Sequence, residues 1–310
     1  MTISIIGAGL SGLLAASQFP EAQIYEKQSR EIIKSHRALL RFRSDKIGRA
    51  LGIPFKEVTV HKAIWSEGNF IKPNPKVCNQ YSLKVAGTIE DRSIWNIDTC
   101  KRWIAPENLH ELLLERFNDR IEWNSNMAWF EKQSATDNVI STGPMYNTLN
   151  FCDTIKYDKE KYVFNKQKIT VRRYRVPESN VYQTIYFPDP SFGVYRASLN
   201  GNRLIVESID NDSFFARGDE DSIIDIFNCF GISMTELIDC ITQNLGKITY
   251  FNDIERKHLI YEMSRDYGIY SLGRFAIWKN ILLDDVWNDI EVIKQLINKN
   301  EYELLKNNLL

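Results

Sequence analysis

The beginning of the chain constrains the fold more than any other segment, because it combines a strand, a glycine-rich turn and a helix. Residues 3–6 are an apolar, strand-forming run, residues 7–12 read Gly-Ala-Gly-Leu-Ser-Gly, and residues 13–19 continue as an apolar helix. A second short strand, residues 22–25, ends at Glu26. A glycine-rich turn can occur alone, but this order of elements predicts a dinucleotide-binding βαβ unit.

The three glycines of this unit have different expected roles. Gly7 permits the tight turn, Gly9 lets backbone N–H groups approach a pyrophosphate, and Gly12 lets the helix pack closely on the strand. The pyrophosphate then lies at the positive end of the helix dipole, and Glu26 can accept hydrogen bonds from a ribose diol. The residues expected to contact the dinucleotide here are Gly7, Gly9, Leu10, Ser11, Gly12, Glu26 and Lys27.

Charge and hydropathy narrow the class of partner. The 310 residues carry a formal net charge of −1, so no global field attracts nucleic acid or an anionic membrane. Basic runs at 34–49 and 168–175 leave a nucleic-acid partner open without favouring it. No apolar run approaches the roughly 18 residues of a membrane span, so we expect no membrane partner. The sequence leaves the oligomeric state open.

The cysteines and histidines carry no recognisable site pattern. The five cysteines are widely spaced and contain no CxxC, which predicts reduced thiols and a cytoplasmic location. The first residues lack the basic segment and cleavage site of a signal peptide. The four histidines have no metal-ligand spacing, so we predict no metal site.

The rest of the chain predicts a discontinuous organisation. Residues 58–103 read as irregular and aromatic, and Asn200-Gly201 is a strong hairpin signal. Expected helices are 44–51, 108–118, 219–229, 233–245 and 284–298, and expected strands are 121–123, 137–142, 168–176, 180–187, 194–199 and 203–208. The simplest account is a nucleotide-binding domain of residues 1–57, 104–145 and 265–310, interrupted by a substrate or cap domain of residues 58–103 and 146–264.

Three segments together resemble a known superfamily. They are the glycine hairpin ending at Glu26, the Ile-Ser-Thr-Gly-Pro segment at 140–144, and residues 267–278, which contain Gly273-Arg274-Phe275 and precede Asp284-Asp285. In order and spacing they resemble the FAD-binding motifs of the UDP-galactopyranose mutase and flavin amine oxidase-like superfamily. The resemblance implies an α/β fold, with a Rossmann-like FAD-binding domain of the glutathione reductase type and an inserted domain of mixed β-sheet and helices.

The resemblance also implies which dinucleotide binds. A nicotinamide dehydrogenase does not need a C-terminal glycine–arginine segment that returns to the first domain, whereas FAD is long and is usually held at both ends. The further cofactor-binding residues expected on this basis are Ser141, Thr142, Gly143, Gly273 and Arg274. No cysteine or histidine lies in a flavin-attachment motif, so we expect noncovalent FAD. With no second GxGxxG in the chain, any NAD(P)H donor has to bind transiently.

A basic run at 35–43 is a second candidate for the pyrophosphate. Relatives of this fold place an arginine in this part of the chain, and a guanidinium can engage two phosphate oxygens at once. Arg37 and Arg43 are the favoured residues. The alternative is an amphipathic, solvated helix whose leucines pack inward. The sequence lacks the paired glycines that relatives often have near this point.

The inserted domain offers candidate catalytic residues on neighbouring strands. In the run 172–175, Arg173 and Arg175 share one face of a strand because side chains alternate. A sheet that carries arginines and tyrosines can cover a flavin and bind an anionic or sugar-nucleotide substrate. The candidates are Arg173, Tyr182, Tyr186 and Arg196. The alternative is an exposed sheet face with ordinary strand-forming tyrosines.

Several functions remain open at this point. The leading one is an FAD-dependent oxidoreductase with a small-molecule or nucleotide-linked substrate. The others are non-redox flavin catalysis of the mutase kind on a sugar nucleotide, and amine oxidase or lyase chemistry on a modified nucleobase or aminoacyl group. A non-enzymatic flavin-fold binding module is less favoured, because both FAD-binding ends are retained. Fold resemblance does not transfer chemistry.

Overall fold

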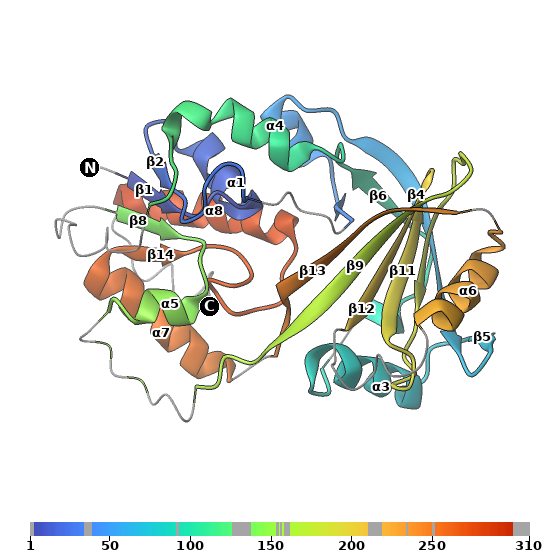
Figure 1. The fold of residues 1–310 in the computed structure, drawn as a ribbon. Coiled ribbons are helices and arrows are strands. Elements are labelled where there is room, and N and C mark those ends of the chain that lie inside the picture. Colours follow the sequence, from blue (N-terminus) through green and yellow to red (C-terminus); the bar gives the residue numbers. More distant parts are fainter. Residues whose placement is uncertain are drawn as a thin grey trace.

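Two β-sheets dominate the computed structural model (Figure 1). The structure describes residues 3–33, 39–90, 93–125, 138–152, 155, 157, 162–209, 219–233, 235–249 and 252–299. The helices are α1 (Leu10–Gln18), α2 (Lys46–Leu51), α3 (Pro75–Ala86), α4 (Leu109–Arg116), α5 (Met145–Leu149), α6 (Asp219–Phe230), α7 (Asp253–Tyr267) and α8 (Leu283–Lys299), with 3-10 turns at Ser93–Trp95 and Asn118–Arg120. Within these ranges, no helix combines the length and apolar character needed to cross a bilayer.

The first sheet is parallel and has the strand order β14-β8-β1-β2-β7. Its strands are β1 (Ile3–Ile6), β2 (Gln23–Tyr25), β7 (Ile121–Glu122), β8 (Asn138–Ser141) and β14 (Ile269–Ser271). From β1 the chain first forms β2, which pairs with one edge of β1, and later forms β8, which pairs with the opposite edge of β1. In parallel sheets, ligands bind beyond the carboxyl ends of the strands at such a reversal of order.

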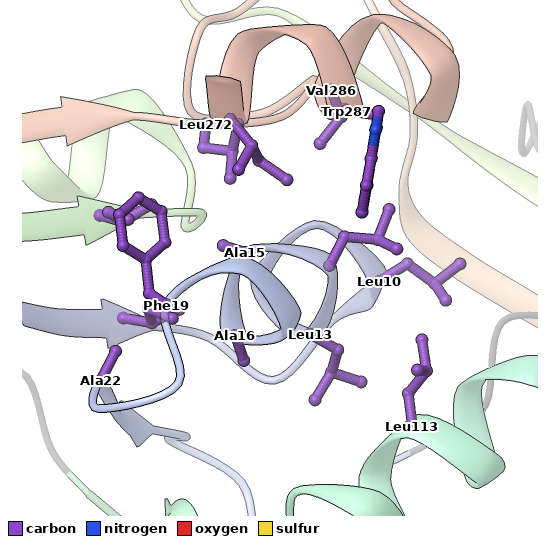
Figure 2. Packing of buried hydrophobic residues seen from close by; sticks show 14 of the residues in the cluster. Leu10, Leu13, Ala15, Ala16, Phe19, Ala22, Leu113, Leu272, Val286 and Trp287 are labelled. Atoms are coloured by element: carbon purple, nitrogen blue, oxygen red, sulfur yellow. The ribbon is translucent and has the colours of Figure 1, made fainter. Parts of the chain in front are cut away.

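Helix α1 lies at the centre of the core beside this sheet (Figure 2). Leu13 is fully buried and faces Leu113 of α4, while Leu10 lies toward Trp287 of α8. Burial of each large apolar side chain contributes about 1.5–3 kcal/mol to folding. The core therefore fixes α1, and with it the glycine hairpin, against helices that come from distant parts of the chain.

The second sheet is mixed and has nine strands. They are β3 (Arg41–Phe42), β4 (Lys56–Ser66), β5 (Asn69–Ile71), β6 (Cys100–Ile104), β9 (Lys166–Arg175), β10 (Tyr182–Tyr186), β11 (Val194–Asn200), β12 (Arg203–Ile209) and β13 (Glu236–Ile248). Their order is β13-β9-β12-β11-β10-β4-β6-β3, with β5 on β4, and all pairs are antiparallel except β10 with β4. The expected α/β class, with a Rossmann-like sheet and an additional mixed sheet, is confirmed.

Two helices cover opposite faces of the mixed sheet. On one face, α3 contributes Val77 and Tyr81 to a cluster with Val171 and Tyr186. On the other face, α6 contributes Ile226 to a separate cluster that contains strand residues of opposite parity, such as Tyr174. The alternation of side chains along each strand explains this division. The face covered by α3 also carries the polar residues described below.

Two secondary-structure elements contact the sheet that belongs to the other predicted domain. Strand β3, within the range 1–57, pairs with β6 of the mixed sheet. Helix α7, most of which lies in the range 146–264, packs against β14 of the parallel sheet and shares a hydrophobic cluster with α5. In Figure 1, the long strands β9 and β13 run from the side of the parallel sheet into the mixed sheet.

Two expectations about secondary structure were wrong. Residues 233–245, expected to be helical, lie largely in strand β13, which pairs with β9 along its length. Ile238, Ile241 and Leu245 have helical spacing, but pairing along β9 overrides this local signal. The range 58–103, expected to be irregular, contains most of β4 and all of α3. Helix α3 begins at a cap, because the Asn74 side chain accepts a hydrogen bond from the Val77 amide.

Candidate functional site

The expected cofactor residues gather beyond the carboxyl ends of four parallel strands. Gly7 follows β1, Glu26 follows β2, Thr142 follows β8 and Gly273 follows β14 by one residue. Hydrogen bonds join these loops, since the Thr142 amide and hydroxyl both donate to the Ile6 carbonyl, at 3.0 and 2.7 Å. The parallel sheet thus brings together segments that are far apart in the sequence.

Close packing requires glycine at two positions of the hairpin. Gly7 has a φ of +100°, and a Cβ at this position would lie 2.5 Å from Oγ1 of Thr142. A Cβ on Gly12 would overlap the carbonyl oxygen of Gly7. Gly12 therefore lets α1 begin directly against the end of β1, as the sequence predicts.

The surroundings of Gly9 are open. A Cβ added to Gly9 would meet no protein atom within 4 Å, and the residue has an ordinary φ of −72°. Packing and backbone strain therefore do not require glycine here.

Gly9 caps α1 without a side chain, and the first internal amide is that of Leu13, which donates to the Gly9 carbonyl at 3.0 Å. No described residue accepts a hydrogen bond from the three preceding helical amides, those of Leu10, Ser11 and Gly12.

Unpaired first-turn amides beside open space form a favourable site for a pyrophosphate. Such amides need a partner outside the helix, and the helix dipole favours a negative one. A glycine that no protein neighbour requires leaves room for a ligand to approach the backbone. The hairpin residues therefore fit the diphosphate of a dinucleotide.

Glu26 is buried and holds the hairpin in place. One carboxylate oxygen accepts a hydrogen bond from the Ala8 amide at 2.7 Å, and the other accepts one from the Gln28 amide at 2.9 Å. Each oxygen retains a further lone pair, so binding of a ribose hydroxyl stays compatible with this position. The adjacent Lys27 is exposed.

His110 is a contact of the hairpin that the sequence reasoning missed. This buried residue of α4 places Nε2 2.9 Å from the Ala8 carbonyl oxygen, so Nε2 carries the proton. Its Nδ1 atom is buried and has no partner among the described residues. Ala8 is thus held through its amide by Glu26 and through its carbonyl by His110. A lone histidine on a helix gave no sequence signal for this role.

At the end of β8, the side chains of Ser141 and Thr142 make contacts within the protein, whereas Gly143 borders open space. The Ser141 hydroxyl is buried and lies 2.9 Å from the hydroxyl of Thr148 in α5, so this side chain stabilises the loop from within. Thr142 donates hydrogen bonds to the Ile6 carbonyl of β1, as described above. A Cβ on Gly143 would meet nothing within 4 Å, so this glycine borders open space as Gly9 does.

The C-terminal glycine returns to the hairpin, as the resemblance implies. Gly273 has a φ of +91°, and a Cβ at this position would lie 2.5 Å from Oγ of Ser11. The next residue, Arg274, donates from Nη2 to the Ile281 carbonyl at 3.3 Å. Arg256 of α7 is fully buried and donates to the Ile277 carbonyl at 3.0 Å, which holds this segment from the other side.

The arginines of the run 35–43 take separate positions. Arg37 lies outside the described residues. Arg43 pairs with Asp285 at 2.5 Å, and its amide donates to Asp284 at 2.9 Å, so it links β3 to the start of α8. Their contact with a pyrophosphate stays a prediction. Arg41, which the sequence reasoning did not favour, lies in the edge strand β3 of the mixed sheet and extends to β10 and β11 of the same sheet.

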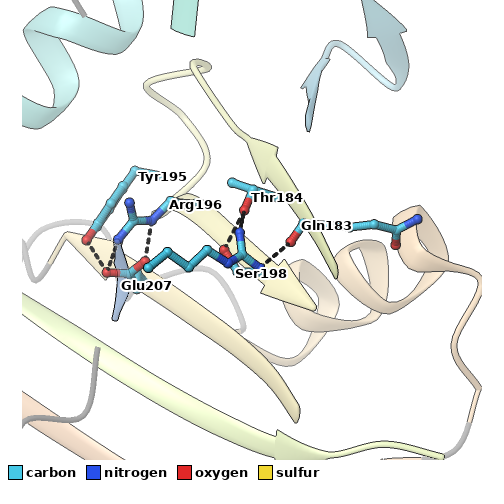
Figure 3. A network of polar contacts seen from close by, with 7 residues as sticks. Gln183, Thr184, Tyr195, Arg196, Ser198 and Glu207 are labelled. Carbon is cyan, nitrogen blue, oxygen red and sulfur yellow. Dashed lines mark hydrogen bonds and ion pairs between the residues drawn. The ribbon is translucent and has the colours of Figure 1, made fainter. Parts of the chain in front are cut away.

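A buried polar network lies on the mixed sheet (Figure 3). Glu207 of β12 accepts two hydrogen bonds from the Arg196 guanidinium, one of them at 2.8 Å, and one from the Tyr195 hydroxyl at 2.9 Å. An irregular register between Val194 and Arg196 lets two consecutive residues of β11 reach the same carboxylate. Burial alone would raise the pKa of Glu207, but the Arg196 charge and hydrogen bonds lower it to about 2.

Arg41 adds a second guanidinium beside this network. Its Nη1 donates to the Thr184 hydroxyl at 2.6 Å, and its Nη2 donates to the Leu199 carbonyl at 3.1 Å. The Thr184 hydroxyl also lies 3.0 Å from that of Ser198. A carboxylate at position 207, directly after the apolar run 204–206 of β12, was the sequence signal that could have located the network.

The structure places two of the four candidate catalytic residues side by side, because Tyr186 of β10 pairs with Arg196 of β11 in the sheet register, whereas Tyr182 and Arg173 have other partners. Arg196 lies in the network, and Tyr186 packs edge-to-face on Tyr81, with ring centroids 5.5 Å apart. Tyr182 instead accepts a hydrogen bond from the Lys56 ammonium at 2.7 Å. Arg173 forms an ion pair with Asp239 of the edge strand β13.

Comparisons with known proteins identify the fold. Neither a protein-family model nor a curated protein matches the sequence. Among solved structures, reduced UDP-galactopyranose mutase matches with a TM-score of 0.68 at 15% identity, covering 99% of this chain and 96% of that one. An oxidoreductase from Methanosarcina mazei matches with a TM-score of 0.57 at 10% identity, covering 95% and 100%.

A third match extends the likeness to an amine oxidase. A putrescine oxidase variant with redesigned cofactor binding matches with a TM-score of 0.53 at 11% identity, covering 96% of this chain and 99% of that one. Each match spans nearly the whole of both chains, so the likeness includes both sheets. The chain therefore has the fold shared by these UDP-galactopyranose mutase, oxidoreductase and putrescine oxidase structures.

Proposed function

We propose that the protein is an FAD-dependent enzyme that holds the cofactor noncovalently and acts on a small-molecule or nucleotide-linked substrate. The observation that carries the proposal is the contact between Gly273 and Ser11, which joins the C-terminal segment to the open Gly9 hairpin. The α1 amides bind the diphosphate, Glu26 and His110 hold the hairpin, and Arg274 interacts with the cofactor. Bound FAD supplies the redox or nucleophilic centre of the reaction.

The absorbance of the purified protein tests cofactor binding directly. We expect a flavin spectrum and release of the flavin on denaturation, because no attachment motif is present in the sequence. Protein that is colourless and does not bind added FAD would contradict the proposal. Replacement of Arg274 by Ala is expected to weaken FAD binding or shift the flavin potential, with the fold retained.

The leading reaction class is oxidoreduction, with an electron donor that anaerobic titration can identify. Reduction of the flavin by NAD(P)H would indicate a transiently bound nicotinamide, whereas reduction by an amine would indicate an amine oxidase. Binding of a nucleic acid would show as a steep dependence of affinity on salt.

Non-redox catalysis on a sugar nucleotide is the second candidate, and the match to UDP-galactopyranose mutase favours it. The test is to incubate chemically reduced protein with UDP-galactopyranose and to follow isomer formation by chromatography. Product formed without net oxidation of the flavin would support this class. Absence of product, together with flavin reduction by a donor in the separate titration, would support the oxidoreductase.

A further inference from the structure

The network on the mixed sheet contains more positive than negative charge. Glu207 is the carboxylate that contacts Arg196, and no described carboxylate contacts Arg41. Arg41 donates only to a hydroxyl and to backbone carbonyls, and its buried Nε atom has no partner among the described residues. Burial, together with the charge of Arg196, lowers the pKa of Arg41 to about 10. A buried cation without a counterion is costly, so this cluster favours an added anion.

The cluster also has a donor group that remains accessible, the guanidinium of Arg196. The Arg196 side chain is 31% exposed, although its partner Glu207 is buried. Its Nε and Nη2 atoms bind Glu207, and no described residue accepts a hydrogen bond from Nη1. The hydroxyls of Thr184 and Ser198 are buried and lie beside Arg41 on the adjacent strands (Figure 3).

The cluster lies where the two sheets meet. Strand β3, at the edge of the mixed sheet, places Phe42 in the core beside the parallel sheet, while the preceding residue, Arg41, reaches β10 and β11 within the mixed sheet. The two preceding residues also pack on different clusters: Leu39 packs on the α3 cluster, and Leu40 packs on the core around α1. A ligand at Arg41 and Arg196 is thus bound by the mixed sheet at its junction with the cofactor-binding half.

We propose that Arg41 and Arg196 form a binding site for an anionic group of the substrate, a carboxylate or a phosphate, with Thr184 and Ser198 as further hydrogen-bonding partners. Guanidinium groups bind both anions through paired N–H donors. The assignment of this anion to the substrate rests on the proposed function. The anion site itself does not require FAD to bind.

The test measures anion binding in the purified protein by isothermal titration calorimetry, with chloride keeping the ionic strength constant. Inorganic phosphate and acetate are the two probes, and the tighter one identifies the preferred group. The hairpin at Gly9 is a competing phosphate site, so the titrations are repeated with Gly9→Val protein. We expect phosphate or acetate binding to survive Gly9→Val and to weaken at least tenfold in Arg41→Gln.

Arg175→Gln is the matched control, because Arg175 lies on the same sheet and forms an exposed pair with Glu236. It is expected to bind both probes like the wild type. Normal binding by Arg41→Gln, loss of all binding in Gly9→Val, or binding of neither probe by the wild type would overturn the proposal. A protein that binds no FAD but shows the expected anion binding would refute only the proposed function.

A measurement on the wild type does not depend on folding of the variants. Phenylglyoxal modifies accessible guanidinium groups, and peptide mass spectrometry locates the product. The preferred probe should slow modification of Arg196 several-fold and leave Arg175 unaffected. Equal rates at Arg196 with and without the probe would also overturn the site.

Discussion

The three glycines of the hairpin differ in whether backbone conformation and neighbouring atoms require a glycine. Gly7 needs its positive φ and has Thr142 against it, and Gly12 has the Gly7 carbonyl against it, whereas Gly9 has neither constraint. Substitution at Gly7 or Gly12 therefore disturbs the fold. Substitution at Gly9 reaches only the space where a ligand is expected.

Gly9→Val is predicted to abolish FAD binding and to change the free energy of unfolding without cofactor by no more than about 1 kcal/mol, since only a helix cap is altered. Gly7→Val is the matched comparison and should cost about 1–3 kcal/mol from backbone strain alone. Chemical denaturation and flavin titration of the two variants measure both effects. Full FAD occupancy in Gly9→Val would mean that the hairpin is only structural.

Arg196 and Glu207 are predicted to be strongly coupled. Arg196→Met removes the guanidinium partner of the buried Glu207 carboxylate, which keeps only its other contacts such as the Tyr195 hydroxyl, and should destabilise the protein by about 3–5 kcal/mol, whereas the Arg196→Met/Glu207→Met double variant should lose less than the sum of the single variants. The lowered pKa of Glu207 means that its stabilisation is present above about pH 4.5 and is lost as pH falls toward about 2. Denaturant unfolding at several pH values tests this.

The exposed pair Arg175–Glu236 provides the control for this cycle, because its side chains are 60% and 68% exposed. Removal of an exposed pair changes stability by about 0–1 kcal/mol. Additive effects of the two substitutions at Arg196 and Glu207 would contradict the coupling.

Among the secondary-structure elements, most of those with local signals were predicted, although α3 was missed despite its Asn74 cap, and β13, which is defined by a distant partner, was missed as well. The βαβ unit and the β11–β12 hairpin are encoded in short segments, and α2 ends at Gly52 in the left-handed conformation, as its Gly-Ile-Pro segment indicates. Strand β13 was missed because its pairing with β9 is not visible in its own sequence. Gly246 supports the pairing, since a Cβ there would overlap Ile169 of β9.

Helix α8 contains a carboxyl group that is predicted to limit stability at high pH. Burial and the charge of Asp285 raise the pKa of Asp289 from 3.8 to about 6. The folded state therefore disfavours the charged form, and stability is lost as pH rises from about 4 through about 6. A difference of about two in pKa corresponds to about 3 kcal/mol, so Asp289→Asn should stabilise the protein by up to about 3 kcal/mol at pH 8.

The same substitution at exposed Asp98 is the control and should have little effect. Thermal or denaturant unfolding at pH 4 and pH 8 measures both variants. Equal stabilisation by Asp289→Asn at the two pH values would exclude an ionisation effect and indicate a change in packing.

For the molecule as a whole, the spatial arrangement of the residues expected to bind a cofactor was more predictable than that of the residues expected to bind substrate. Glycines with fixed spacing encode the hairpin, and the resemblance located Gly273 correctly against it. The contacts of Arg41 with Thr184 and of His110 with Ala8 join residues 143 and 102 positions apart, and no local pattern encodes them. Pairing of strands from distant segments decides which arginines and tyrosines meet.

The last prediction uses this assembly of distant segments. Because Ser11 lies against Gly273, bound FAD should stabilise the hairpin and the C-terminal segment together. At free FAD about 100-fold above its Kd, the free energy of unfolding should rise by about 2.7 kcal/mol in the wild type and not in Gly9→Val. Hydrogen exchange followed by mass spectrometry should show slower exchange in residues 7–12 and 272–278 alike. Protection confined to residues 7–12 would show that the C-terminal segment does not take part in holding the cofactor.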